Sequence, residues 1–353
     1  CVYWLGDPCS CSHSRAVLSC RTSRNSFPPV YRDAPLPHSM LINLVPDFFT
    51  VLQSTDPVAA YQRYFETHRP LLEAYWHNYV LDPSGPHFLD VVREAVYAYR
   101  DDLRAMLGRV DIAALARSAE QQCTALFEVD SRVDVVLMIG VGGANAGELV
   151  VNGKGIAFAC LEHFTGVANT STRGLGLEPE LLPMWLSHEL AHAVRYTSPR
   201  SRSALRQFVA DQGGYYSYWE TGRHVPLREH LVNEGLAVQA ARLLSPGHAP
   251  WEYFGFQRRQ YVRTREMEPI LFRSVAEELG SSALGLRLRW LSGGMSDDAR
   301  TVDRYVIPER AGYFLGARLV EDAITEHGIA TCLRMSAEEL LGMAPAEMVV
   351  RTA

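Results

Sequence analysis

The stretch HELAH, from His188 to His192, constrains the fold and the chemistry of this chain more than any other segment. Residues four apart lie on one face of an α-helix, so the two histidines can present ring nitrogens to one metal ion. Glu189 follows the first histidine and therefore points beside such a metal. There its carboxylate can take a proton from a water that the metal activates.

The helix that carries this stretch is predicted from about Pro179 to Tyr196, and most of its other residues are apolar. A surface helix with two unrelated histidines is the ordinary alternative. Polar groups in so apolar a helix must be paired or ligated, because burying them alone costs free energy. The pattern therefore favours a metal site, with the spacing typical of Zn²⁺.

A catalytic zinc site needs a third protein ligand and one open position. The metzincin pattern is excluded, because Arg195 and Ser198 stand where that pattern has its Gly and its third His. Glu234 is the predicted third ligand. One further predicted helix, at 203–218, lies between it and the HELAH helix, and leaves room for the chain to return. The neighbouring Gly235 would let another helix, or the metal, approach closely. The alternative is an ordinary acidic residue near a helix N-terminus, where the macrodipole favours it.

Three segments together carry a resemblance to a known family. They are HELAHAVR at 188–195, NEGLA at 233–237 and AGYFLG at 311–316. The chain resembles the bacterial predicted zinc-dependent proteases called YjaZ-like proteins across residues 130–330. The first two segments are also shared by many gluzincins. The resemblance implies a gluzincin fold and peptidase activity.

A peptidase also needs a donor for the oxyanion of its tetrahedral intermediate. Tyr313, flanked by glycines in a late helix, is the first candidate, and an ordinary core tyrosine is the alternative. His230 is the second candidate, because it lies four residues before Glu234 on the same helical face. It could equally be a plain surface histidine. Arg195, one turn after His192, is expected to hold its helix by a salt bridge rather than to bind a substrate carboxylate.

The rest of the sequence predicts an α+β fold that is mostly helical, with a small sheet before the HELAH helix. Residues 40–130 form a helical N-terminal region, and residues 131–353 form the zincin-like catalytic region. Strands are expected at 133–141 and 155–161, with an apolar run at 149–151 between them. The predicted helices cover residues 56–79 with a break at Pro70, 87–107, 111–127, 203–218, 227–244, 269–279, 308–327 and 337–349.

An extended peptide substrate commonly pairs with an exposed sheet edge. The strand at 155–161 is the predicted edge, because it precedes the helix that carries HELAH. The glycine-rich Gly142–Asn145 is expected near it. A phosphate-binding loop is the rival interpretation of these glycines. The pattern G-x-x-x-x-G-K-S/T is absent, which argues against it.

Composition excludes several classes of protein. The chain has 353 residues, a net charge of −6 and 47% hydrophobic residues, which excludes wholesale disorder and a general nucleic-acid binder. No run of about 18 uncharged apolar residues predicts a membrane span. A cytoplasmic protein is therefore expected, and the oligomeric state stays open.

Residues 1–39 are expected to form an irregular extension that is not part of the native protein, since the chain opens on Cys and Met40 begins the first folded-looking segment. A processed lipoprotein is an alternative for a leading Cys. Four of the seven cysteines fall in this extension, but their spacing matches no reliable zinc knuckle.

Taken together, these residues predict a zinc-dependent hydrolase with a peptide or protein substrate and one Zn²⁺ per chain. His188, His192 and Glu234 are the ligands, and Glu189 acts as general base and then as general acid. Two alternatives stay open. One is a zinc hydrolase acting on a non-peptide amide, and the other is a scaffold that binds zinc or peptides without turnover.

Overall fold

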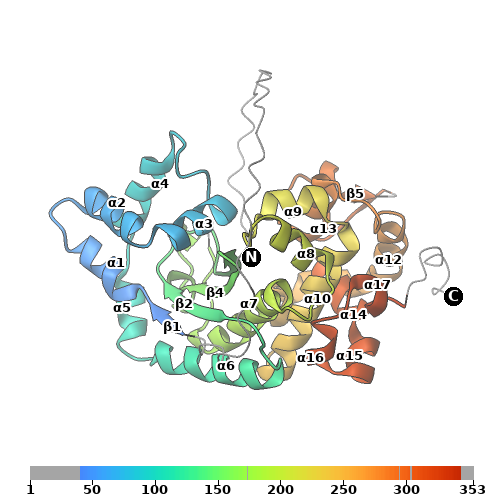
Figure 1. The fold of residues 1–353 in the computed structure, drawn as a ribbon. Coiled ribbons are helices and arrows are strands. Elements are labelled where there is room, and N and C mark those ends of the chain that lie inside the picture. Colours follow the sequence, from blue (N-terminus) through green and yellow to red (C-terminus); the bar gives the residue numbers. More distant parts are fainter. Residues whose placement is uncertain (1–39, 173, 294, 303, 343–353) are drawn as a thin grey trace, which may run out of the picture.

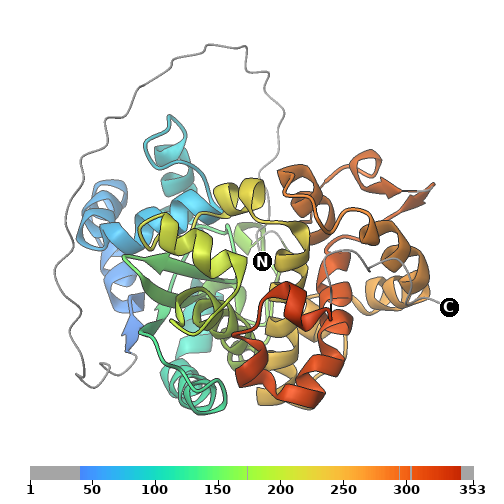
Figure 2. The same cartoon turned by 45° about the vertical axis from the view of Figure 1, so that its right-hand side comes forward.

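The computed structural model describes residues 40–172, 174–293, 295–302 and 304–342, so the predicted extension and the end of the last predicted helix lie outside the described residues. The architecture is α+β and mostly helical, as predicted. Figures 1 and 2 show the N-terminal helices and the C-terminal helices on opposite sides of a small sheet and one central helix. Within the described residues, no helix combines the length and the apolar character needed to cross a membrane.

The N-terminal helices begin and end where local chemistry predicts. Asp56 accepts a hydrogen bond from the Ala59 amide and starts α2, and Asp111 does the same for α6 through Ala114. The predicted helix at 87–107 is instead two helices, because Ala98 is extended (φ −64°, ψ 149°). The helices of this region are α1 (Val45–Leu52), α2 (Pro57–Thr67), α3 (Arg69–Tyr79), α4 (Phe88–Tyr97), α5 (Asp101–Leu107) and α6 (Ile112–Leu126).

The main sheet has four strands in the order β1-β2-β4-β3. They are β1 (Leu41–Asn43), β2 (Val133–Met138), β3 (Ala146–Val151) and β4 (Lys154–Cys160). Strands β1, β2 and β4 run parallel, and β3 runs antiparallel to β4. The hairpin turns on Asn152 and Gly153, both with positive φ (53° and 74°), as an Asn-Gly hairpin turn requires.

This order corrects one prediction. The strand at 155–161, expected to be the edge that pairs with substrate, is β4 and lies between β2 and β3. Its backbone groups on both sides are used by neighbouring strands, so it cannot take an added chain. The sheet edge next to the HELAH helix is β3. This strand contains the apolar run at 149–151 and begins three residues before it. The prediction failed because sequence order does not reveal a strand order that crosses over.

The HELAH helix is α7 (Leu182–Thr197), which follows a single 3₁₀ turn at Pro179–Leu181 and is almost wholly buried. It packs against β3, β4, α6 and α10 (Leu227–Leu244). Close packing on the sheet depends on small residues, since a Cβ added at Gly155 would lie 3.2 Å from the Cβ of Ala193. This central position explains why the helix is apolar around its histidines.

Helix α10 packs on α14 (Ala311–Leu319) through two facing glycines. A Cβ added at Gly235 would collide with the carbonyl of Gly316, and one added at Gly316 would collide with the carbonyl of Leu231. The glycine beside Glu234 therefore serves helix–helix contact. Its entropic cost, about 1 kcal/mol against Ala in a helix interior, is offset by this contact.

Of the remaining helices, α13, α16 and α17 pack on α10. The prediction of one helix at 203–218 is wrong. Gly213 and Gly214 adopt positive φ (71° and 76°) and separate two short helices, α8 and α9. The predicted helix at 308–327 is divided at Val320, and α11 and α13 were not predicted. These elements are α8 (Ala204–Asp211), α9 (Tyr218–His224), α11 (Arg258–Glu266), α12 (Glu268–Ala276), α13 (Leu284–Leu291), α15 (Glu321–His327), α16 (Ile329–Cys332), α17 (Ala337–Leu340) and the ribbon β5 (Thr301–Val302) with β6 (Tyr305–Val306).

Candidate metal centre

Helices α7 and α10 bring the three predicted ligands to one point. The Nε2 atoms of His188 and His192 lie 3.1 Å apart, and the Glu234 Oε2 atom lies 3.3 Å and 3.4 Å from them. Both histidines are buried, and the Glu234 side chain is 14% exposed. The helical i, i+4 spacing sets the first pair, and the packing of α10 against α7 sets the third donor.

This triangle fits a tetrahedral zinc ion. Ligand bonds of 2.0–2.1 Å at tetrahedral angles place ligand atoms about 3.3–3.4 Å apart. The donor set of two imidazole nitrogens and one carboxylate oxygen is also the set of a catalytic zinc site with one open position. A second group of donors, from Glu148, Glu189 and His192, lies within 4.8 Å of one another. The tighter triangle and its donor set favour the first group.

Charge within the triangle is already distributed as an ion pair. Burial lowers the pKa of His188 to about 4, which keeps its ring neutral. Burial acts to lower the pKa of His192, but the charge and hydrogen bond of Glu234, together with the charges of Glu148 and Glu189, outweigh burial and raise that pKa. For Glu234, burial acts upward, whereas the charge of His192 and hydrogen bonds from both histidines hold its pKa well below the usual range. The carboxylate is therefore ionised, as a ligand must be.

Glu189 lies beside this triangle and is 2% exposed. Burial, reinforced by the nearby charge of Glu148, raises the pKa of Glu189 to about 8. Hydrophobic burial of a carboxyl group is a common way to poise it for proton transfer near neutral pH. The position and the environment of Glu189 both suit a proton acceptor next to a metal-activated water.

Each ligand histidine is flanked by a tyrosine ring. Tyr313 stacks on His188, with ring centres 6.1 Å apart and planes 16° apart, and Tyr196 stacks on His192 at 6.1 Å and 14°. Tyr313 lines the same pocket as the ligands, as its predicted role requires. The Arg310 guanidinium lies 4.3 Å from the centre of its ring.

His230 does not reach this pocket. It is buried, and its Nε2 atom lies 3.2 Å from the carbonyl oxygen of Thr221, to which it can donate. Burial, followed by the charge of Arg287, lowers its pKa well below the ordinary value. This hydrogen bond joins α10 to α9. The geometry does not support a role for His230 as the oxyanion donor.

The pocket around the triangle also contains residues that the sequence analysis missed. The space that the centre of a water molecule can occupy in it is about 30 Å³, enough for one or two waters. The additional lining residues are Tyr79, Glu148, Tyr218, Arg287, Leu291 and Ser292. Glu148 left one usable signal in the sequence, a single charge within the apolar strand β3. The others come from distant helices and left none.

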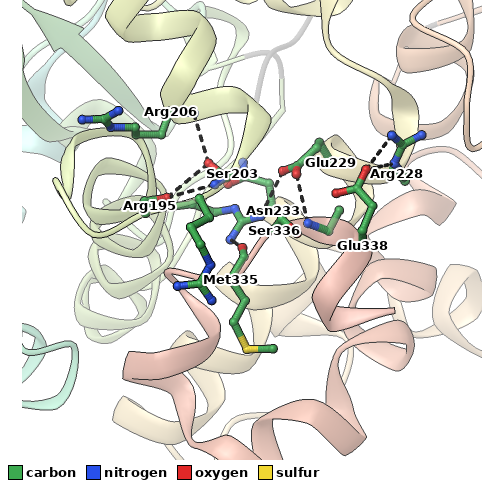
Figure 3. Close-up of polar contacts among 12 residues, drawn as sticks. Arg195, Ser203, Arg206, Arg228, Glu229, Asn233, Met335, Ser336 and Glu338 are labelled. Atoms are coloured by element: carbon green, nitrogen blue, oxygen red, sulfur yellow. Dashed lines mark hydrogen bonds and ion pairs between the residues drawn. The ribbon is translucent and has the colours of Figure 1, made fainter. Parts of the chain in front are cut away.

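Arg195 forms the predicted salt bridge, and it does so in the interior. Its Nη2 atom lies 2.9 Å from Glu229 Oε2 with both side chains fully buried, and so α7 is joined to α10 (Figure 3). Nη1 donates to the Met335 carbonyl at 2.7 Å, and the other Glu229 oxygen accepts from the Ala337 amide at 3.0 Å. The pair thus fastens the segment before α17 against the two helices that carry the ligands.

Comparison of the chain with family models, with curated proteins and with solved structures found no match.

Proposed function

We propose that the chain is a zinc-dependent hydrolase of gluzincin type that cleaves peptide bonds. The observation that carries the proposal is the triangle of two imidazole nitrogens and one carboxylate oxygen at 3.1–3.4 Å, with Glu189 in the same pocket. The arrangement of the chain around it agrees with a zincin: a parallel sheet with an antiparallel edge strand, the HELAH helix packed on that sheet, and the third ligand on a following helix.

The residues of the chain have distinct parts in this reaction. Zn²⁺ bound at the triangle would supply Lewis-acid activation of a water and of the scissile carbonyl. Glu189 accepts the proton of the attacking water and then delivers it to the departing amine, a task that suits a carboxyl group in the same pocket as the triangle. Tyr313, which lines the same pocket, would donate its hydroxyl proton to the oxygen that gains charge in the transition state.

The test is hydrolysis of a mixed peptide library, followed by mass spectrometry, with and without a zinc chelator. Cleavage that stops with chelator and returns with added Zn²⁺ is the expected result. Acylated amines that are not peptides form a second panel. Turnover of that panel alone would favour the non-peptide amidase, and zinc binding without turnover of either panel would favour the scaffold.

Metal content gives an independent prediction. Protein purified without chelator should carry about one equivalent of zinc, because three donors of this kind make one site. The variant Glu234→Ala removes one donor and should lose most of that zinc, as measured by plasma emission spectrometry. Glu180→Gln, at an exposed carboxylate just before α7, is the matched control and should keep it. Full occupancy in Glu234→Ala would remove Glu234 from the site.

The oxyanion donor can be tested by removing one hydroxyl. We expect Tyr313→Phe to lower kcat by roughly 10²–10³ with little change in KM, since the hydrogen bond forms only in the transition state. Tyr218→Phe is the comparison, because the Tyr218 hydroxyl lines the same pocket but already pairs with Ser292 Oγ at 3.0 Å. A larger loss in Tyr218→Phe than in Tyr313→Phe would transfer the role to Tyr218.

A further inference from the structure

The outer edge of β3 is closed by groups of the chain itself. The Tyr79 hydroxyl accepts from the Glu148 amide at 3.0 Å and lies 2.8 Å from the carbonyl oxygen of the same residue. The Tyr216 amide donates to the Val150 carbonyl at 3.0 Å. A long peptide therefore cannot continue along this edge past Glu148 by adding a strand. A substrate strand added to this edge would have to end at Glu148.

The carboxylate of Glu148 faces the metal pocket at that end point. The Tyr79 hydroxyl lies 2.9 Å from Glu148 Oε2, and the Tyr196 hydroxyl donates to Glu148 Oε1 at 3.2 Å. These donors are neutral, and across residues 40–342, within the ranges the structure describes, Glu148 has no ion pair with Arg or Lys. An ionised carboxylate offers about four acceptor positions, so it keeps capacity for another donor.

Glu148 lies close enough to Glu189 and His192 for a single amino-acid residue to reach from one to the other. A carboxylate oxygen of Glu148 lies within 4.8 Å of donor atoms of Glu189 and His192. The nitrogen and carbonyl carbon of one residue are about 2.5 Å apart, given standard backbone geometry. An amino group held by Glu148 would thus bring its own carbonyl to Glu189 and the ligand triangle.

We propose that Glu148 binds the free α-amino group of a peptide substrate, so that the site releases residues from the amino terminus. This inference rests on the proposed function and narrows it to an aminopeptidase.

Arg287 is the competing anchor, for a substrate carboxylate, because it lines the same pocket and its Nε atom is buried without a hydrogen-bond partner among the described residues. Three of its five N–H donors, however, are already used. Nη1 donates to the Tyr218 carbonyl and to Thr221 Oγ1, and Nη2 lies 3.0 Å from the Tyr216 hydroxyl. The guanidinium also lies 3.7 Å from the centre of the Tyr218 ring. The chain itself therefore holds most of this guanidinium in the pocket wall, which leaves it less capacity for a ligand than Glu148 has.

The experiment uses one tripeptide in four forms: free, N-acetylated, C-amidated and blocked at both ends. We expect N-acetylation to lower kcat/KM at least about 100-fold, because a desolvated charge loses its partner, and C-amidation to change it less than about tenfold. Equal cleavage of the free and N-acetylated forms overturns the proposal. A large loss on C-amidation alone also overturns it and assigns the anchor to Arg287.

The variant Glu148→Gln is judged by the ratio of kcat/KM for the free and N-acetylated forms, which a general loss of folded protein does not move. We expect the ratio to fall from at least about 100 to less than about 10, with Glu180→Gln unchanged. A variant that keeps the wild-type ratio overturns the proposal and leaves Glu148 the role of holding β3.

Calorimetry separates this proposal from the proposed function. L-alaninamide should bind the protein as purified, N-acetyl-L-alaninamide should bind at least about 100-fold more weakly, and Glu148→Gln should remove the difference. Absence of cleavage for all four peptides would overturn the peptidase assignment. Equal binding of the two amides would overturn the amine anchor, whether or not any peptide is cleaved.

Discussion

Replacing Glu189 by Gln is expected to lower peptide turnover by roughly 10²–10⁴-fold while the protein keeps its zinc and its fold. The amide preserves the size and shape of the side chain but cannot accept a proton. Glu189 lies next to a ligand in sequence without belonging to the 3.1–3.4 Å triangle, so its loss should not release metal. Steady-state kinetics together with zinc content would measure both parts.

The matched control is Glu180→Gln, the same substitution at an exposed site just before α7. It should keep the wild-type rate. Wild-type turnover in Glu189→Gln would show that the general base lies elsewhere. Loss of zinc from Glu189→Gln would instead make Glu189 a ligand.

Breaking the buried pair between α7 and α10 should have the largest effect on stability. Arg195→Met removes a guanidinium that is fully buried and leaves the Glu229 carboxylate without its cation. Removing one partner of a buried ion pair costs about 3–5 kcal/mol in the free energy of unfolding, because the remaining charge stays desolvated. Denaturant unfolding would measure the change.

Two further variants make this prediction specific. Arg223→Met breaks the exposed pair with Glu220, whose side chains are 49% and 45% exposed, and should cost less than about 1 kcal/mol. The double variant Arg195→Met with Glu229→Leu removes both charges of the pair. Its loss in the free energy of unfolding should therefore be smaller than the sum of the losses in the two single variants. Additive losses would show that the two side chains do not act as a pair.

The three candidate metal ligands could be predicted, two of them from a local rule and the third from the chemistry of the donor set. The i, i+4 spacing of His188 and His192 follows from the geometry of one helix, whatever surrounds it. Glu234 followed from the chemistry of a third donor and from the glycine beside it, which the packing of α10 on α14 explains. Asp56 and Asp111 likewise start their helices by capping within four residues.

The rest of the site depends on contacts between residues far apart in the sequence. Glu148 reaches the pocket only because β3 folds back on β4 at Asn152 and Gly153 and lies against α7. Tyr79 comes to the same strand from α3, 69 residues away. The strand order that places β4 inside the sheet is equally non-local. No periodicity in the sequence encodes these contacts, so the position of Glu148 at the pocket and the strand order of the sheet could be seen only in the fold.

The position of the metal tests the central claim most directly. Crystals of the zinc-loaded protein, measured on both sides of the zinc absorption edge, would locate the ion by its anomalous signal. The account predicts one peak about 2.0–2.2 Å from His188 Nε2, His192 Nε2 and a carboxylate oxygen of Glu234. A peak held instead by Glu148, Glu189 and His192 would contradict it, because Glu189 would then be a ligand and could not serve as the base.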